Sequence, residues 1–183
     1  MSEPYDVVVI GGGVVGLAAA IAMRKHRLSV AVMDAGSMSV SLTQPDLRVY
    51  AINAASQALF QSLKVWEQLD VKRISPYQYM HVWDASNQAY IDFDARMIAR
   101  DKLGDIIEES VVKHALLKVA EDEGVTLLPN HKAEAVEVDT NGVRVESGAS
   151  SIKGNLLIVA DGANSPTRKQ LGVEFEAHGV KAA

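Results

Sequence analysis

The sequence predicts an α/β fold with a mostly antiparallel insertion, and three observations carry this prediction. Residues 5–10 have the pattern of a buried strand and run through a glycine-rich turn into an Ala-rich amphipathic segment. A second fully apolar run of strand length, 156–160, comes late in the chain. Between them, residues 79–94 alternate apolar and polar side chains around Ser86-Asn87, which is typical of a β-hairpin.

The first strand, turn and helix predict a binding site for a dinucleotide. Residues 7–10 are β-branched without a polar break, as in a central parallel strand. In the turn that follows, Gly11 suits a tight bend, Gly13 lets the backbone approach a phosphate, and Gly16 lets helix and strand pack closely. The free N–H groups and positive dipole end of the helix favour a pyrophosphate. Two alternative interpretations of this segment are a glycine-rich turn in another kind of α/β protein and a membrane or signal segment.

A second strand, 28–33, ends at Asp34, 18 residues after Gly16. An acid about 20 residues beyond the glycine turn accepts hydrogen bonds from a ribose diol and repels a 2′-phosphate. Asp34 therefore favours an adenosine of the FAD or NAD type over that of NADP.

The remaining elements follow from turn signals and apolar spacing. We predict a loop over 35–47, a helix over 53–63 with Trp66 and Leu69 extending its apolar set, and an amphipathic helix over 106–122. Strands are expected at 125–128 and 133–138, and Asn141-Gly142 is a strong hairpin turn. Residues 156–160 are expected to return to the central parallel sheet.

Composition excludes several classes of function. The net charge of −5 shows no excess of basic residues, so the composition does not suggest binding to nucleic acid. The absence of cysteine excludes disulfides and thiolate metal sites and fits a reducing compartment. The five histidines are scattered without metal-binding spacing, so we predict no metal site. No side chain is predicted as a catalytic acid, base or nucleophile.

Four motifs together resemble the FAD-dependent aromatic hydroxylases, which are flavoprotein monooxygenases, and most closely their ubiquinone-biosynthesis branch. The first is the glycine turn with Asp34, and the second runs from Asp46-Leu-Arg48 to Ser56. The third is Ile107-Glu108-Glu109-Ser-Val111, and the fourth is Asp161-Gly162-Ala-Asn-Ser with Arg168. The resemblance covers essentially the whole chain and implies a Rossmann-like FAD-binding domain with part of an inserted substrate domain.

The resemblance also implies which residues bind the cofactor. The glycine turn would hold the FAD pyrophosphate and Asp34 the adenosine ribose, where relatives usually carry Glu. Arg48 would lie near the cofactor or be a surface arginine, and Glu108 would lie near the ribityl chain or be an N-terminal helix acid. Asp161 would bind FAD, cap a helix, or both, and Arg168 would contact phosphate or pair with a surface acid. The predicted cofactor-binding set is Gly11, Gly13, Val14, Val15, Gly16, Asp34, Arg48, Glu108, Asp161 and Gly162.

Relatives in this family run to about twice the present length, so we expect the N-terminal portion of a longer enzyme rather than a naturally short protein. The expected divisions are 1–71 and 101–175 for the FAD-binding domain, 72–100 for a hairpin of the substrate domain, and 176–183 for the start of a truncated strand. Relatives often have Gly where Arg27 stands, at the end of the first helix.

By resemblance, the whole enzyme would use NAD(P)H, FAD and O₂ to hydroxylate the ring of a polyprenylated phenol. The expected location is cytoplasmic, at the periphery of the inner membrane or in a biosynthetic complex. The isolated portion is expected to be inactive, to bind FAD weakly or not at all, and to self-associate through exposed apolar surface. The alternatives are another FAD or NAD oxidoreductase and a non-catalytic scaffold.

Overall fold

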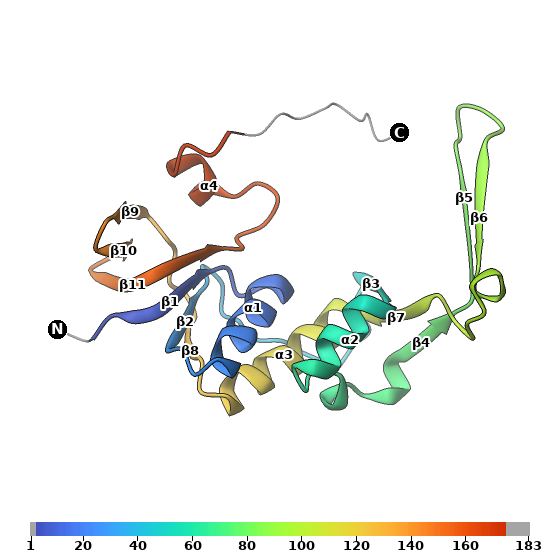
Figure 1. Cartoon of the computed structure of the whole chain (residues 1–183), viewed down its shortest axis with the longest axis horizontal. Coiled ribbons are helices and arrows are strands. Elements are labelled where there is room, and N and C mark those ends of the chain that lie inside the picture. Colours follow the sequence, from blue (N-terminus) through green and yellow to red (C-terminus); the bar gives the residue numbers. More distant parts are fainter. Residues whose placement is uncertain (1–2, 175–183) are drawn as a thin grey trace. The chain divides into compact units, whose positions relative to one another are not determined.

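The computed structural model describes residues 3–174, which form two compact units. The first unit combines the segments before residue 39 and after residue 119, and the second unit comprises residues 39–119. The expected strand at 176–183 lies outside the described residues. Figure 1 labels the elements of both units.

The first unit contains a six-stranded sheet with the order β8-β2-β1-β11-β10-β9. Its strands are β1 (Tyr5–Ile10), β2 (Val30–Met33), β8 (Thr126–Leu128), β9 (Ala135–Asp139), β10 (Gly142–Ser147) and β11 (Ser150–Val159). β1 pairs in parallel with both β2 and β11, and β2 pairs in parallel with β8. The predictions of a central first strand and of a late return to its sheet are therefore confirmed.

The same sheet is antiparallel on its other side, where β10 lies between β9 and β11. The hairpin predicted at Asn141-Gly142 joins β9 to β10. β11 is longer than predicted because its first half pairs with β10 while its second half pairs with β1.

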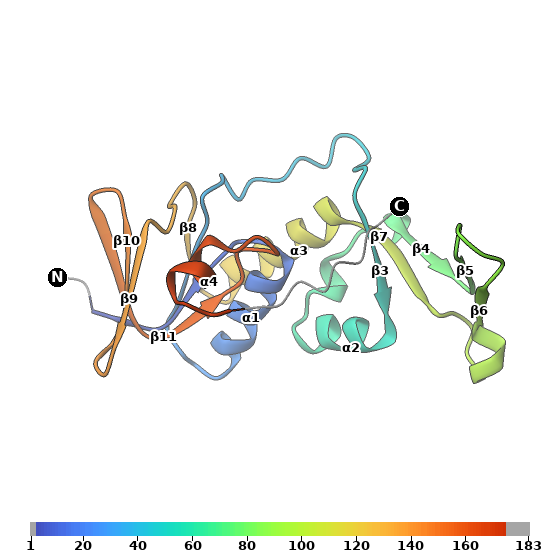
Figure 2. The same ribbon diagram turned by 90° about the horizontal axis from the view of Figure 1, so that it is seen from above.

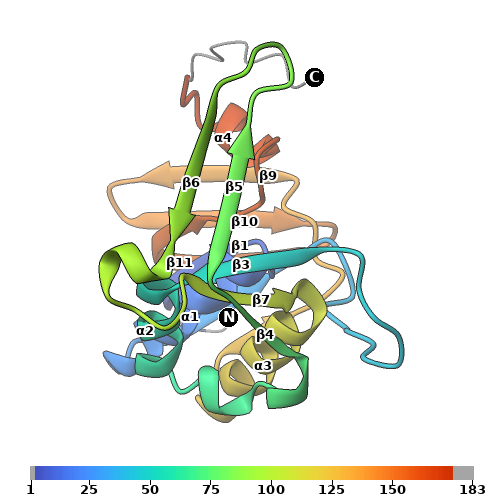
Figure 3. The same ribbon diagram turned by 90° about the vertical axis from the view of Figure 1, so that its right-hand side faces the viewer.

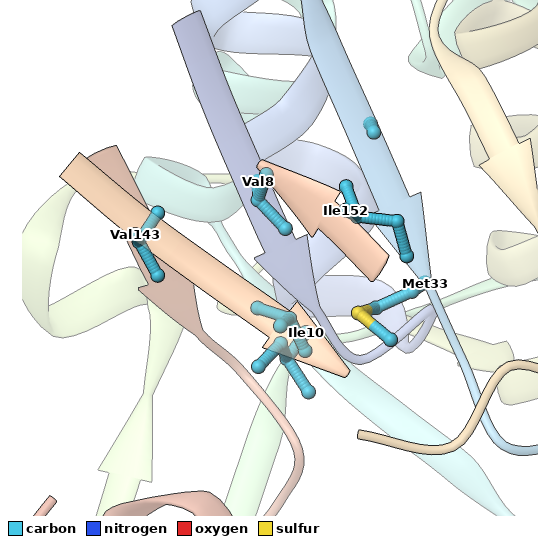
Figure 4. Close-up of a cluster of buried hydrophobic side chains, with 7 residues drawn as sticks. Val8, Ile10, Met33, Val143 and Ile152 are labelled. Carbon is cyan, nitrogen blue, oxygen red and sulfur yellow. The ribbon is translucent and has the colours of Figure 1, made fainter. Parts of the chain in front are cut away.

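Each face of this sheet has its own apolar packing. On one face, Val8, Ile10, Met33, Val143 and Ile152 belong to a single buried cluster (Figure 4). On the other face, α1 (Val14–Lys25) packs against β1 and β2 and buries Leu17, Ala20 and Ile21. Arg27, just after this helix, has a φ of 63°, the left-handed conformation that favours glycine.

The second unit contains a three-stranded antiparallel sheet that sequence patterns did not predict. Its order is β3-β7-β4, with β3 (Val49–Asn53), β4 (Ile74–Tyr77) and β7 (Gly104–Glu108). The predicted loop 35–47 contains no helix or strand (Figure 2). α2 (Ala54–Ser62) confirms the predicted helix, and Asn53 caps it by accepting a hydrogen bond from the Ser56 N–H.

One predicted boundary in this unit is wrong. The helix expected over 106–122 is α3 (Glu109–Asp122), and residues 106–108 belong to β7 instead. Ile106 and Ile107 pair with both β3 and β4, so cross-strand pairing decides their conformation.

The second unit also carries the predicted hairpin, as β5 (Tyr79–Trp83) and β6 (Tyr90–Asp94) (Figure 3). Three short 3-10 helices occur at Trp66–Gln68, Val71–Arg73 and Ala95–Ile98, and α4 (Pro166–Gln170) belongs to the first unit. Leu69 is buried as predicted, whereas Trp66 is half-buried. Within residues 3–174, no helix combines the length and apolar character needed to cross a bilayer.

Candidate functional site

The glycine turn after β1 is held by backbone contacts that only glycine permits. Gly11 has a φ of 111°, and its N–H donates to the carbonyl oxygen of Met33 at 2.8 Å. A Cβ at Gly11 would lie 2.3 Å from the Ala160 carbonyl oxygen. The turn is therefore wedged between the ends of β2 and β11, the two parallel neighbours of β1.

The N-terminal end of α1 has no side-chain cap and no acidic residue in its first turn, so it can accept an anion. Gly13 is its N-cap residue. A Cβ at Gly13 would meet nothing within 4 Å, whereas one at Gly16 would lie 1.9 Å from the Gly11 carbonyl oxygen. Gly16 thus lets the helix sit against the turn, and Gly13 leaves space beside the N–H groups of Val14 and Val15.

Asp34, which follows β2, ties the glycine turn to its own loop. Its Oδ2 accepts a hydrogen bond from the Gly12 N–H at 2.6 Å, and its Oδ1 accepts one from the Gly36 N–H at 2.7 Å. Its carbonyl oxygen accepts the His131 N–H at 2.8 Å. Each carboxylate oxygen keeps a second lone pair, so Asp34 can still accept hydroxyl groups of a ribose.

Asp161 and Gly162 follow β11 and lead into α4. Gly162 has a φ of 94°, and the Ser165 hydroxyl, not Asp161, is the N-cap that accepts the Arg168 N–H. Asp161 Oδ2 accepts the Thr167 N–H at 3.2 Å. Burial of the Asp161 carboxyl opposes ionisation, but hydrogen bonds from neighbouring groups, the Thr167 N–H among them, outweigh it and hold its pKa below the ordinary value.

The residues of the first unit converge on one cavity of about 420 Å³ at the carboxyl ends of the parallel strands. Residues predicted from the sequence that line it are Gly11, Gly13, Asp34, Asp161 and Gly162. Residues that the sequence reasoning missed include His131, Lys132, Ala133, Pro166 and Thr167. The signal that could have found the first three is their place after β8, a strand that ends at the same sheet edge.

This cavity fits the pyrophosphate and adenosine portion of a dinucleotide. The helix start is uncapped, and the space beside Gly13 is open. Within the described part of the chain, the buried Asp161 Oδ1 and Thr167 Oγ1 have no hydrogen-bond partner, and such atoms suit a polar ligand. Arg168 donates from Nη2 to the Ala163 carbonyl oxygen at 3.0 Å.

Arg48 and Glu108 belong to the second unit, where they have protein partners. The Arg48 guanidinium is 70% exposed and pairs with Glu109 at 2.8 Å. The Glu108 carboxylate accepts hydrogen bonds from the Arg73 guanidinium and from the Asp46 N–H. These contacts, that with Arg73 first, hold the pKa of Glu108 below its ordinary value.

The parallel strands, the glycine turn with an open helix start, and the acid after β2 define a dinucleotide-binding domain of the Rossmann type. The chain belongs to the FAD binding domain family, whose profile matches residues 4–183. The family identifies the dinucleotide as FAD.

The chain is similar to enzymes whose names refer to ubiquinone. It is 32% identical to 3-demethoxyubiquinol 3-hydroxylase of Escherichia coli (strain K12), over 96% of this chain and 46% of that protein. It is 34% identical to the mitochondrial ubiquinone biosynthesis monooxygenase COQ6 of Homo sapiens, over 93% of this chain and 40% of that protein. The chain thus spans less than half the length of these relatives.

Among solved structures, the OxyS anhydrotetracycline hydroxylase from Streptomyces rimosus superposes with a TM-score of 0.76 at 21% identity. The match covers 97% of this chain and 36% of that protein. At this level of identity the likeness shows the fold alone, and it confirms the predicted α/β class.

Proposed function

We propose that this chain is the FAD-holding portion of a monooxygenase that hydroxylates the aromatic ring of a polyprenylated phenol in ubiquinone biosynthesis. The observation that carries the proposal is the convergence of the glycine turn, Asp34 and Asp161 on one cavity. The 32% identity to a ubiquinol hydroxylase over 96% of the chain supports the substrate class.

The residues of this chain bind and orient the cofactor rather than react. The uncapped start of α1 would accept the pyrophosphate, because its N–H groups and dipole favour negative charge. Asp34 would accept hydroxyl groups of the adenosine ribose while it holds Gly12 in place. Asp161, ionised and partly unpartnered, would accept a hydrogen bond from the cofactor. We assign no proton-transfer residue.

Bound FAD, reduced by NAD(P)H, supplies the activation of O₂ that ring hydroxylation requires. The protein's contribution is to fix the flavin's position and to exclude water from the reacting centre. The carboxylate of Asp34 disfavours a 2′-phosphate at the adenosine end, so NADPH would not compete with FAD for this cavity.

We further propose that the whole enzyme works in the cytoplasm at the inner-membrane surface or in a biosynthetic complex, because its substrate carries a hydrophobic polyprenyl tail.

The β5–β6 ribbon exposes Met80, Val82, Ile91 and Phe93, which form two adjacent cross-strand pairs. We expect this apolar surface to make the isolated chain self-associate, which sedimentation velocity at increasing concentration would measure.

The whole enzyme that contains this chain provides the test of function. We expect a yellow protein that oxidises NAD(P)H and consumes O₂ in proportion to added polyprenylated phenol. NAD(P)H oxidation by the flavoprotein that no phenol accelerates would favour another oxidoreductase. A colourless protein that also fails to bind added FAD would contradict the proposed enzyme function and favour a non-catalytic scaffold.

A further inference from the structure

A lysine that no motif predicts lines the cavity of the first unit. Lys132 lies there together with Asp34 and Asp161, and among the described lining residues it is the one lysine or arginine. With histidine counted as neutral, the lining therefore has one more acid than it has basic residues. A pyrophosphate, whose phosphates are both ionised, needs positive charge in its surroundings, and Lys132 is the side chain of this lining that can supply it.

The segment that carries Lys132 is fixed against the loop that carries Asp34. After β8, Asn130 has a φ of 59°, a left-handed conformation that asparagine adopts more readily than most residues. Its N–H donates to the Gly36 carbonyl oxygen at 2.8 Å, and the next N–H, that of His131, donates to the Asp34 carbonyl oxygen at 2.8 Å. These two hydrogen bonds hold the backbone next to Lys132 beside Asp34.

Asp34 in turn connects this segment to the glycine turn. Its Oδ2 accepts the Gly12 N–H at 2.6 Å, while its carbonyl oxygen accepts the His131 N–H at 2.8 Å. The glycine turn and the backbone beside Lys132 are therefore both bonded to one residue, at the edge of the sheet where β1 and β2 end. Because a lysine ammonium is carried on a flexible four-carbon stem, Lys132 can approach a phosphate bound at the turn.

The Lys132 ammonium has no ion-pair or hydrogen-bond partner within the part of the chain that the structure describes. Asp34 is the acid nearest to it along these hydrogen bonds, but both oxygens of that carboxylate already accept backbone N–H groups, those of Gly12 and Gly36. The start of α1 contributes about half a positive charge and has no basic side chain in its first turn. The phosphate site is therefore short of positive charge, and Lys132 is free to provide it.

We infer that Lys132 is a binding residue for the pyrophosphate of the cofactor: its ammonium supplies the positive charge that the glycine turn and the two acids of the lining lack. The inference rests on the proposed function, because it takes this cavity to be the FAD site. It assigns the ammonium to the phosphates and not to the ribose 2′ position. Because Lys132 is exposed, dissolved salt should screen the interaction.

The experiment uses the whole enzyme that contains this chain, freed of FAD, as wild type and as Lys132→Gln, Lys132→Arg and Lys132→Glu. Quenching of flavin fluorescence measures the Kd of FAD, and competition with FAD measures those of ADP and adenosine. ADP carries a diphosphate and adenosine does not, so the pair isolates the phosphate contribution. The matched control is Lys153→Gln, which removes the same charge from an exposed lysine of β11 that does not line this cavity.

We expect Lys132→Gln to raise the Kd of FAD and of ADP about fivefold to tenfold and to leave that of adenosine within about twofold of wild type. Lys132→Arg keeps the charge and should stay near wild type, whereas Lys132→Glu should weaken FAD and ADP more than Lys132→Gln does. Salt at about 0.5 M should reduce the difference between wild type and Lys132→Gln to about twofold. The control should change none of these values.

Unchanged affinity for FAD and ADP in Lys132→Gln would overturn the inference. Equal losses for ADP and adenosine would also overturn it, because they would indicate a structural role. A larger loss for adenosine 2′,5′-bisphosphate relative to AMP than for ADP relative to adenosine would place the ammonium at the ribose 2′ position, against the assignment made here. A wild-type enzyme that binds neither FAD nor ADP would instead refute the proposed function, and the inference with it.

Discussion

Replacing Gly16 with alanine should destabilise the first unit far more than the same change at Gly13, three residues earlier. A Cβ at Gly16 would lie 1.9 Å from the Gly11 carbonyl oxygen, where ordinary contact begins at 3.4 Å. The start of α1 and the glycine turn would have to separate by about 1.5 Å. The obstacle is backbone, so no side-chain rotation relieves it.

Overpacking of this kind costs about 1–3 kcal/mol, and we expect about 3 kcal/mol here because the turn is also wedged against Ala160. With an m-value of about 2 kcal/mol/M, this lowers the urea midpoint by about 1.5 M. The assay is urea unfolding followed by circular dichroism, for wild type and both variants.

Gly13→Ala is the matched control because it adds the same methyl group to the same turn. Its φ of −80° is ordinary, and its Cβ meets nothing within 4 Å. Alanine is a poorer N-cap than glycine but loses less entropy on folding, so stability should stay within about 1 kcal/mol of wild type. FAD affinity should nevertheless fall, because the methyl group occupies the phosphate approach. Equal urea midpoints for the two variants would refute this reasoning.

Three further predictions concern single side chains. Asp34→Asn should lower stability by about 1–2 kcal/mol, because an amide has only one oxygen and cannot accept both backbone N–H groups that the carboxylate accepts. The same change should weaken FAD binding. Thermal unfolding measures the first effect and equilibrium dialysis the second, and an unchanged Tm would contradict the first. The pKa values of Asp46 and Glu108 are held below the ordinary value, first by the Arg48 N–H for Asp46 and first by Arg73 for Glu108. The contribution of these two carboxylates to the stability of the folded chain is therefore complete above the ordinary carboxyl pKa of about 4. It is lost as the pH falls through the lower pKa values of the folded state. Urea unfolding across this range should show a shallower loss in Glu108→Gln, and parallel curves would contradict the assignment. Arg27→Gly should stabilise the chain by about 0.5–1 kcal/mol, because relief of the left-handed conformation exceeds the added chain entropy; a lower Tm would argue against strain there.

The elements that sequence patterns predicted correctly are those whose signals are local. The β-branched run of β1, the glycine turn, the Asn141-Gly142 hairpin and the apolar half of β11 each have a pattern that one conformation satisfies. That Gly11, Gly13, Asp34 and Asp161 line one cavity was predictable for the same reason, because the spacing of strand, turn and acid is itself the signal.

The β3-β7-β4 sheet shows where local patterns fail. Ile106 and Ile107 precede α3 and continue its apolar spacing, so the local pattern favours a helix for them. A short apolar run is compatible with either state, and its pairing with residues 49–53 and 74–77 decides for strand. Arg73 carries no local signal at all, because its partner Glu108 is 35 residues away along the chain.

The sequence by itself determined which family this protein belongs to, and hence that its cofactor is FAD, because four local motifs, among them the glycine turn with Asp34 and the Asp161-Gly162 motif, together match that family. Those properties depend on residues whose geometry is set within one or two adjacent elements. Tertiary structure alone decided that Thr167 and the segment after β8 line the same cavity, and that Glu108 is engaged by Arg73 and Asp46. These contacts join segments far apart in the chain, and only the pairing of strands and charges in the folded protein brings them together.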